Sequence, residues 1–326
     1  MLNLLILITL TTMLQLNGHH NGTRARAKPF VKWVGGKTQL LPTIGQAISR
    51  ATAGMDEFTY VEPFVGGGAV LFWTLGNIPN VRKAVINDIN TDLVTAYKTI
   101  RDTPEALITE LRQLEREYRS LNSEEARREF FLGKRDDFNA KQASNVENTT
   151  LFIFLNRTCF NGLFRVNSKG GFNVPFGCYE NPRICDEDTI RANSELLQRV
   201  EILSGDFENT LLCAGENTFF YLDPPYKPLS RTSSFNSYAK EEFGDKEQIR
   251  LKQFCDILTE RGSLWMLSNS DVRSNDPQNT FFDELYSRYE INRVWASRIV
   301  NANPEKRGKL TELLINNYSN TVFQPN

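Results

Sequence analysis

The segment Asp223-Pro224-Pro225-Tyr226 holds the residues whose types and spacing are best suited to chemistry. It directly follows the apolar run 218–222, so a buried strand would end in a rigid polar turn. The two prolines fix φ and remove two backbone N–H donors, which leaves carbonyl oxygens and the Asp223 carboxylate as acceptors. Such a turn can accept hydrogen bonds from an exocyclic amino group while Tyr226 stacks on the base that carries it. The segment therefore predicts methylation of an amino group on an extruded base, with these four residues as the catalytic set.

A glycine turn upstream predicts a second part of the same site. Gly66 and Gly68 follow an apolar strand candidate and would let a ligand approach the backbone. Asp88 ends the next strand candidate about 20 positions later, which is the spacing of a ribose-binding carboxylate. Leu71 replaces the third glycine of a dinucleotide fingerprint, and Val31 stands where a P-loop needs its first glycine. The turn therefore disfavours a hydride-transfer enzyme and an ATPase.

Six segments, taken together, resemble the Dam-type DNA N6-adenine methyltransferases of the alpha arrangement. The matching segments are 30–37, 61–68, 87–88, 161–165 with 172–177, 205–207 and 223–226. The resemblance covers about residues 28 to 318, and six matches in the family's order are more specific than any one alone. It implies site-specific transfer of a methyl group from S-adenosylmethionine to N6 of adenine in duplex DNA. Base flipping and direct in-line transfer, without a metal, are the expected mechanism.

The resemblance also assigns residues to the two substrates. The expected cofactor-binding residues are Trp33, Lys37, Glu62, Phe64, Gly66, Gly68, Asp88, Asp206, Phe207 and Asp223. The expected DNA-binding residues are Lys32, Phe160, Asn161, Leu163, Arg165 and Pro175. Phe160 offers a ring for insertion, where some relatives carry tyrosine, and Arg165 offers a guanidinium suited to guanine. Relatives with a similar loop modify the adenine of GATC, which is therefore the predicted recognition site.

The pattern of apolar segments predicts a fold that can position these residues. The strand candidates are 58–61, 84–87, 200–204, 218–222 and 263–268, followed by a late hairpin-like edge of 289–295 and 311–317. They alternate with helical patterns, which predicts a Rossmann-like, doubly wound α/β methyltransferase sheet with its ligands at the carboxyl ends of the strands. The alternation stops between about 95 and 195. We therefore expect a catalytic domain of 28–95 and 196–326, and a mainly helical target-recognition insertion of 96–195.

Composition supports an enzyme of this size acting on nucleic acid. The 326 residues, 40% of them hydrophobic, suffice for one large α/β domain with an insertion. The formal net charge is only −1, but the basic segments 23–37 and 150–183 could neutralise phosphates. The five cysteines form no C-x-x-C pair, so neither a disulfide framework nor a zinc site is expected.

The first 27 residues resemble neither a complete signal peptide nor a membrane span. Residues 1–16 are apolar, but they lack a basic start and are short for a bilayer. We expect an extension outside the fold of a cytoplasmic, DNA-associated protein with no stable membrane partner. A cognate restriction endonuclease that acts separately is a further candidate partner. Two alternatives stay open: N4-cytosine methylation, whose signature usually begins with Ser in place of Asp223, and a non-catalytic DNA-binding regulator.

Overall fold

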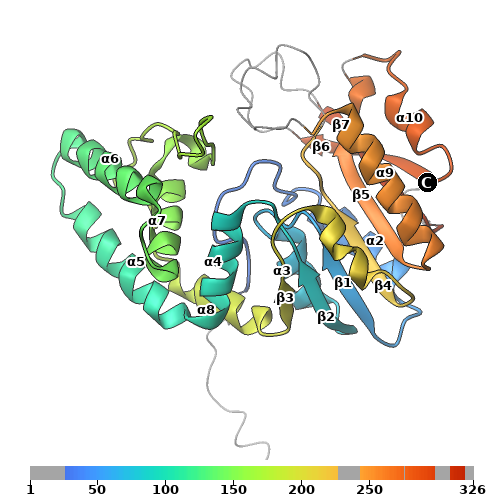
Figure 1. Cartoon of the computed structure of the whole chain (residues 1–326), viewed down its shortest axis with the longest axis horizontal. Coiled ribbons are helices and arrows are strands. Elements are labelled where there is room, and N and C mark those ends of the chain that lie inside the picture. The colour runs from blue at the N-terminus through green and yellow to red at the C-terminus, as the bar shows by residue number, and fades with distance from the viewer. Residues whose placement is uncertain (1–25, 227–242, 275, 298–308, 320–326) are drawn as a thin grey trace, which may run out of the picture.

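The computed structural model describes residues 26–226, 243–274, 276–297 and 309–319, and its centre is a seven-stranded sheet (Figure 1). The strands are β1 Phe58–Glu62, β2 Val81–Ile86, β3 Val200–Ile202, β4 Thr218–Leu222, β5 Leu264–Ser270, β6 Glu290–Ser297 and β7 Lys309–Asn316. They stand in the order β3-β2-β1-β4-β5-β7-β6. β1 to β5 are parallel, and β7 runs antiparallel between β5 and the edge strand β6. The predicted sheet and its late hairpin edge are confirmed.

The sheet is covered by helices on both faces because its strands are apolar on both sides. Along β4, Tyr221 packs into the core on one face and Phe220 into the core on the other. The helices are α2 Leu41–Ala51, α3 Ala69–Asn77, α4 Thr91–Asp102, α5 Pro104–Arg119, α6 Glu124–Ala140, α7 Asn145–Thr158, α8 Glu187–Leu197, α9 Asp245–Glu260 and α10 Phe281–Leu285. Helices α2, α3 and α4 contribute to the first core, and α9 and α10 contribute to the second. This is the doubly wound arrangement.

The region between β2 and β3 is helical, as expected, and α5 to α7 stand together to one side of the sheet (Figure 1). Pro104 is the first residue of α5, and Leu107 and Tyr118 are buried on its inner face. Thr103 is at the N-cap position, but its hydroxyl donates back to the Thr99 carbonyl and makes no cap bond. The proposed domain boundaries at 95/96 and 195/196 fall inside α4 and α8. These two helices therefore join the insertion to the sheet.

The chain enters this fold through a short segment that packs on α8. The backbone N–H and carbonyl of Lys28 both hydrogen-bond the side chain of Asn193, at 3.0 and 2.9 Å. The expectations for residues 1–25 lie outside the described residues. Within the part of the chain that is described, no helix is long and apolar enough to cross a membrane.

Candidate active site

The turn after β4 holds the Asp223 carboxylate between two donors. Its Oδ1 lies 2.7 Å from Nζ of Lys37 and accepts a hydrogen bond from Oγ of Ser268 at 3.0 Å. Burial raises the pKa of Asp223, and the Lys37 ammonium opposes that rise. The side chain is still 19% exposed. The carboxylate is therefore fixed in position but can still be reached from outside.

Lys37 joins the segment before α2 to this turn. Its side chain is only 4% exposed, and Nζ also donates to the Gly35 carbonyl at 2.9 Å. Nζ lies 4.6 Å from the centroid of the Tyr226 ring, which is a cation–π contact. The ammonium is thus at the site, with the Asp223 carboxylate as its charged partner. It is not available to neutralise a phosphate, although the sequence placed Lys37 in a basic segment.

Tyr226 and the two prolines are held by residues from two other elements. The Tyr226 hydroxyl donates to Oε2 of Glu312 in β7 at 2.8 Å. Pro224 is buried and Pro225 is exposed. Nε2 of Gln248 in α9 lies 3.5 Å from the Pro225 carbonyl, which is a weak contact. The four predicted catalytic residues therefore form one turn supported from β5, β7 and α9.

The glycine turn after β1 is packed too closely for any other residue. Gly66 has φ +49°, and a Cβ there would lie 2.8 Å from Cδ1 of Trp33. Gly68 has φ +75°, and a Cβ there would lie 2.4 Å from the Tyr97 hydroxyl. That hydroxyl donates to the Gly66 carbonyl at 2.9 Å. Positive φ and close contact together require glycine at both positions.

Asp88 lies against this glycine turn. Oδ2 accepts the Gly66 N–H at 3.0 Å, and Oδ1 accepts the Asn90 N–H at 2.9 Å. Burial raises the pKa of Asp88, and the backbone donors oppose the rise. The carboxylate is therefore fixed at the carboxyl end of β2, beside the turn that follows β1.

Glu62 brings the two turns into one electrostatic site. It is 2% exposed and accepts a hydrogen bond from the Tyr60 hydroxyl at 2.8 Å. Burial raises its pKa well above the ordinary value, and the nearby charges of Asp223 and Asp88 raise it further. β1 lies between β2 and β4, so the ends of all three strands are adjacent. The structure thus places the Asp223 turn next to the glycine turn.

Asp206 and Phe207 follow β3 at the same edge of the sheet. Asp206 caps the short 3₁₀ helix Phe207–Cys213, and its Oδ2 accepts from Nη2 of Arg250 at 2.6 Å. The Phe207 ring is 3% exposed, with the Phe64 ring 5.2 Å away and the Arg250 guanidinium 4.4 Å above it. The rings of Phe64 and Phe207 therefore pack against each other, and the neighbouring Asp206 side chain is partly exposed.

The loop after α7 presents one aromatic ring to solvent. Phe160 is 53% exposed, although its N–H is fixed by the Pro175 carbonyl at 2.8 Å. Asn161 has φ +55°, and Leu163 is half-buried against the core. Nε of Arg165 donates to Oδ1 of Asn173 at 2.8 Å, and Nη2 donates to the Asn173 carbonyl at 3.2 Å. The loop is therefore rigidly supported, and the ring of Phe160 is free to contact a ligand.

A buried asparagine ties this loop to the segment that carries Lys32. Oδ1 of Asn156 accepts the Lys32 N–H at 2.8 Å, and Nδ2 donates to the carbonyls of Lys32 and Gly162, each at 2.9 Å. The ring of Trp33 stacks on Phe164 with centroids 5.6 Å apart. The expected DNA-binding residues Lys32 and Phe160 to Arg165 therefore share one support.

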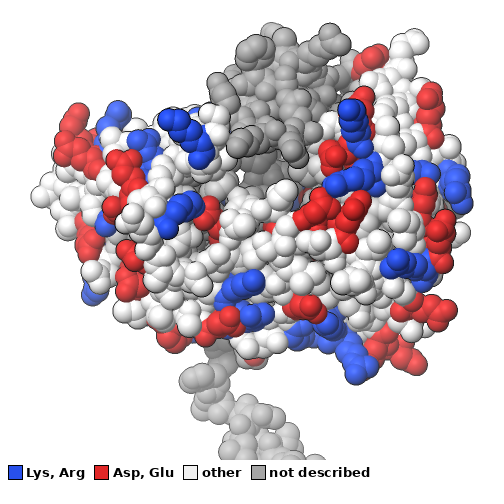
Figure 2. Space-filling view, viewed as in Figure 1, with Lys and Arg blue, Asp and Glu red and all other residues white. Residues whose placement is uncertain are grey.

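The basic segments are more engaged in internal contacts than their composition suggested. Arg157 donates to the Phe30 carbonyl at 2.7 Å, while Lys28 and Arg183 both pair with Asp186. On the face shown in Figure 2, basic and acidic side chains are interspersed among the described residues. Lys32 is exposed, and its side chain lies against Gly162 in the loop after α7.

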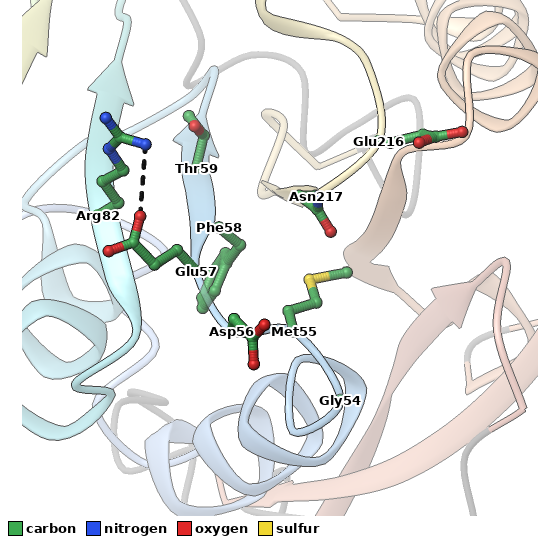
Figure 3. Close-up of a pocket in the computed structure, with 9 residues that line it drawn as sticks. All are labelled: Gly54, Met55, Asp56, Glu57, Phe58, Thr59, Arg82, Glu216 and Asn217. Atoms are coloured by element: carbon green, nitrogen blue, oxygen red, sulfur yellow. Dashed lines mark ion pairs between the residues drawn. The ribbon is translucent and has the colours of Figure 1, made fainter.

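Two clefts formed by described residues are not lined by any predicted site residue. One of about 550 Å³ opens at the amino-terminal ends of the strands, where Arg82 and Glu57 form an ion pair at 3.4 Å (Figure 3). The other, of about 590 Å³, lies beside β3 and is lined by Leu203 and Leu212. The first cleft is at the opposite end of the strands from the candidate active site, and the second is lined by none of the site glycines or site carboxylates.

Four residues that support the site were not identified from the sequence: Tyr97, Asn156, Ser268 and Glu312. Ser268 gave a usable signal, because it is a polar residue at the end of the strand candidate 263–268. Tyr97 lies four positions after Leu93 in an apolar helical pattern and looked like a core residue. Asn156 and Glu312 gave no signal, since only the folded chain shows what they contact.

Comparison with known proteins agrees with this geometry. The family model of the D12 class N6 adenine-specific DNA methyltransferases matches residues 33–300. Type II methyltransferase M.MjaIII of Methanocaldococcus jannaschii is 47% identical over 89% of this chain and 99% of that protein. Type II methyltransferase M1.LlaDCHI of Lactococcus lactis subsp. cremoris is 40% identical over 90% and 96%, and the DNA adenine methylase of Escherichia coli K12 is 30% identical over 88% and 94%. Because the match extends over most of the chain, the protein belongs to the D12 class of N6 adenine-specific DNA methyltransferases.

Proposed function

We propose that this adenine-specific DNA methyltransferase takes its methyl group from S-adenosylmethionine, bound across the turns that follow β1, β2 and β3. Asp88 is held by two backbone N–H groups and has lone pairs left for ribose hydroxyls. Ile89, directly after it, is 77% exposed and offers an apolar face for an adenine ring. Gly66 and Gly68, both at positive φ, hold the turn after β1 beside this carboxylate. These residues fit the cofactor, and bound S-adenosylmethionine supplies an electrophilic methyl group on a sulfonium.

The catalytic turn provides acceptors for the target amine. Lys37 and Ser268 engage Oδ1 of Asp223, so we assign Oδ2 and the Pro224 carbonyl to the two hydrogens of adenine N6. Accepting both hydrogens favours a pyramidal nitrogen, whose lone pair forms the new N–C bond as the S–C bond of the donor breaks and a thioether is released. One N6 proton then leaves through Oδ2 of Asp223. Holding both reactants in this geometry supplies up to about 7–11 kcal/mol of the barrier reduction in an ideal arrangement. No covalent enzyme intermediate is needed.

Tyr226 contacts the flipped base, and Phe160 fills the space that the base leaves in the duplex. The Tyr226 ring, fixed by Glu312 at its hydroxyl, stacks on the flipped adenine for about 1–3 kcal/mol. The exposed Phe160 ring inserts into the duplex as the base leaves. The Arg165 guanidinium, oriented by Asn173, reads guanine through the N–H groups that Asn173 does not use.

We extend the proposal to the recognition sequence GATC and to a cytoplasmic, DNA-associated enzyme. The observation that carries the GATC assignment is the loop 160–177. Its segments 161–165 and 172–177 match the family's loop and include or adjoin Phe160 and Arg165. Two relatives are named Type II methyltransferases, so a separate restriction endonuclease of the same specificity is a candidate partner.

One experiment tests the site and the sequence together. The purified enzyme is incubated with S-adenosylmethionine and unmethylated DNA, and modified bases are then mapped at single-base resolution. N6-methyladenine confined to GATC is the expected result. Methylation in another sequence would overturn the GATC assignment, and N4-methylcytosine would contradict the role given to Asp223.

A further inference from the structure

Ser268 lies in β5 next to the catalytic turn, two residues before the strand ends. Its side chain is fully buried, and its strand pairs with β4 just before Asp223, with Leu267 opposite Leu222. A polar group in such a position is retained at a cost unless it makes hydrogen bonds. Ser268 makes two.

The two hydrogen bonds of Ser268 join it to Asp223 and to Tyr221, which is two residues before Asp223 in the chain. Its Oγ donates to Oδ1 of Asp223 at 3.0 Å and shares a hydrogen bond with the Tyr221 hydroxyl at 3.0 Å. Lys37 is on the same oxygen of Asp223 at 2.7 Å. Within the described residues, Oδ2 of Asp223 has no donor. The two carboxylate oxygens are therefore not equivalent.

This inequality has a geometric consequence for the reaction. A carboxylate held at only one point can rotate about χ2 and offer either oxygen to the amine. Two donors arriving on Oδ1 from different elements, the segment before α2 and β5, fix the plane of the group. In-line transfer depends on that plane, because the nitrogen lone pair must point along the axis of the breaking bond.

We propose that Ser268 is a positioning residue for methyl transfer: together with Lys37 it binds Oδ1 of Asp223 and so presents Oδ2 to the target amine. This inference rests on the proposed function, in which Asp223 accepts the hydrogens of adenine N6. Ser268 itself touches neither substrate.

The same strand provides a matched control. Ser270 lies two positions further along β5, on the same side of the strand, and is 5% exposed. Its Oγ has no hydrogen-bond partner in the described part of the chain. Ser270→Ala therefore removes a buried hydroxyl of the same kind without touching Asp223.

The test compares the wild type, Ser268→Ala, Ser268→Cys, Ser270→Ala and Asp223→Ala in single-turnover methyl transfer at saturating donor and DNA. We expect Ser268→Ala to lower the rate by about tenfold to hundredfold, as for loss of a hydrogen bond to a charged group. Its affinities for S-adenosylmethionine and DNA should not change. Ser268→Cys, which keeps a weak donor of similar size, should fall between the wild type and Ser268→Ala. Ser270→Ala should match the wild type.

The pH dependence of the single-turnover rate distinguishes positioning from a general loss of structure. The Ser268 hydroxyl lowers the pKa of Asp223, so its removal should move the acidic limb of the profile to higher pH. The other titratable groups facing Asp223 are Lys37, Glu62, Tyr221 and Tyr226, with Glu312 behind Tyr226, and all are unchanged in the variant. Ser270→Ala should leave the limb in place.

The outcomes separate this inference from the function on which it rests. An active Asp223→Ala enzyme would overturn the proposed function and the inference together. If Asp223→Ala is inactive but both Ser268 variants match Ser270→Ala in rate and pH limb, only the inference fails. If Ser268→Ala does not fold, the rate and pH limb of Ser268→Cys decide.

Discussion

The contact between Lys37 and Asp223 yields the sharpest prediction for stability. Lys37→Met keeps most of the side-chain volume, including the contact with the Tyr226 ring, but removes the charge. The Asp223 carboxylate then loses the ammonium 2.7 Å away, in a site where Lys37 is 4% exposed. Removing one partner of a buried pair costs about 3–5 kcal/mol. Because Asp223 is 19% exposed and stays partly hydrated, we expect the low end, about 3 kcal/mol at neutral pH.

The pH dependence of this loss has a definite sign. In Lys37→Met, burial of Asp223 is no longer opposed by an ammonium, so its folded-state pKa rises further above that of the unfolded chain, which is about 3.9. The folded state then holds the proton more tightly than the unfolded state. The variant should therefore lose stability relative to the wild type as pH rises from the wild-type folded-state pKa of Asp223 towards the still higher pKa in the variant, and should recover most of it at lower pH.

Urea unfolding of the free enzyme between acid and neutral pH measures this effect. Asp223→Asn removes the charge that Lys37 balances, so adding Lys37→Met to it should cost much less than 3 kcal/mol. Lys83→Met is the exposed control: Lys83 pairs with Glu201 at 2.6 Å, but both side chains are about half exposed, and a loss of about 0–1 kcal/mol is expected. A pH-independent loss, or no coupling between positions 37 and 223, would refute the reasoning.

Three further predictions concern the glycine turn, the catalytic carboxylate and the recognition loop. Gly66→Ala must adopt φ +49° against Trp33, so it should lose at least about 1–2 kcal/mol in thermal unfolding and bind the methyl donor more weakly. Its control Gly76→Ala, in α3 with open space around it, should be neutral or slightly stabilising. Asp223→Ala should abolish turnover while DNA affinity stays near wild type, and turnover near wild type would contradict its role. Arg165→Ala should lose about 1–3 kcal/mol of discrimination at guanine, measured as kcat/KM on GATC and on guanine-substituted sites; unchanged discrimination would rule out guanine reading.

The sequence predicted those parts of the fold that depend on local pattern. Apolar runs bounded by turn residues located β1 and β4 to within a residue, because strands buried on both faces read as continuous hydrophobic segments. In α5, Pro104 at the first position and apolar residues at a 3.6-residue period are local features of the same kind. Threonine directly before a helix usually caps it, but the Thr103 hydroxyl donates to a carbonyl one turn earlier in α4 and does not bond an N–H of α5.

The contacts within the site could not be predicted, because they connect distant parts of the chain. Ser268 is 45 positions from Asp223, Glu312 is 86 from Tyr226, and Asn156 is 124 from Lys32. No local pattern encodes such pairs. The same holds for Lys37, whose basic neighbours in the sequence suggested a surface charge although its partner is a buried carboxylate.

The place of Trp33 limits what mutagenesis can separate. One side of its indole packs on the backbone of Gly66, where a Cβ would already be too close, and its ring stacks on Phe164 in the recognition loop. Any substitution at position 33 therefore disturbs the proposed donor pocket and the proposed base-reading loop at the same time. The kinetic defects of a Trp33 variant will therefore combine weaker binding of the methyl donor with weaker binding of DNA. Variants of Gly66 and Arg165 can separate the two effects, because each residue is assigned to only one of the two substrates.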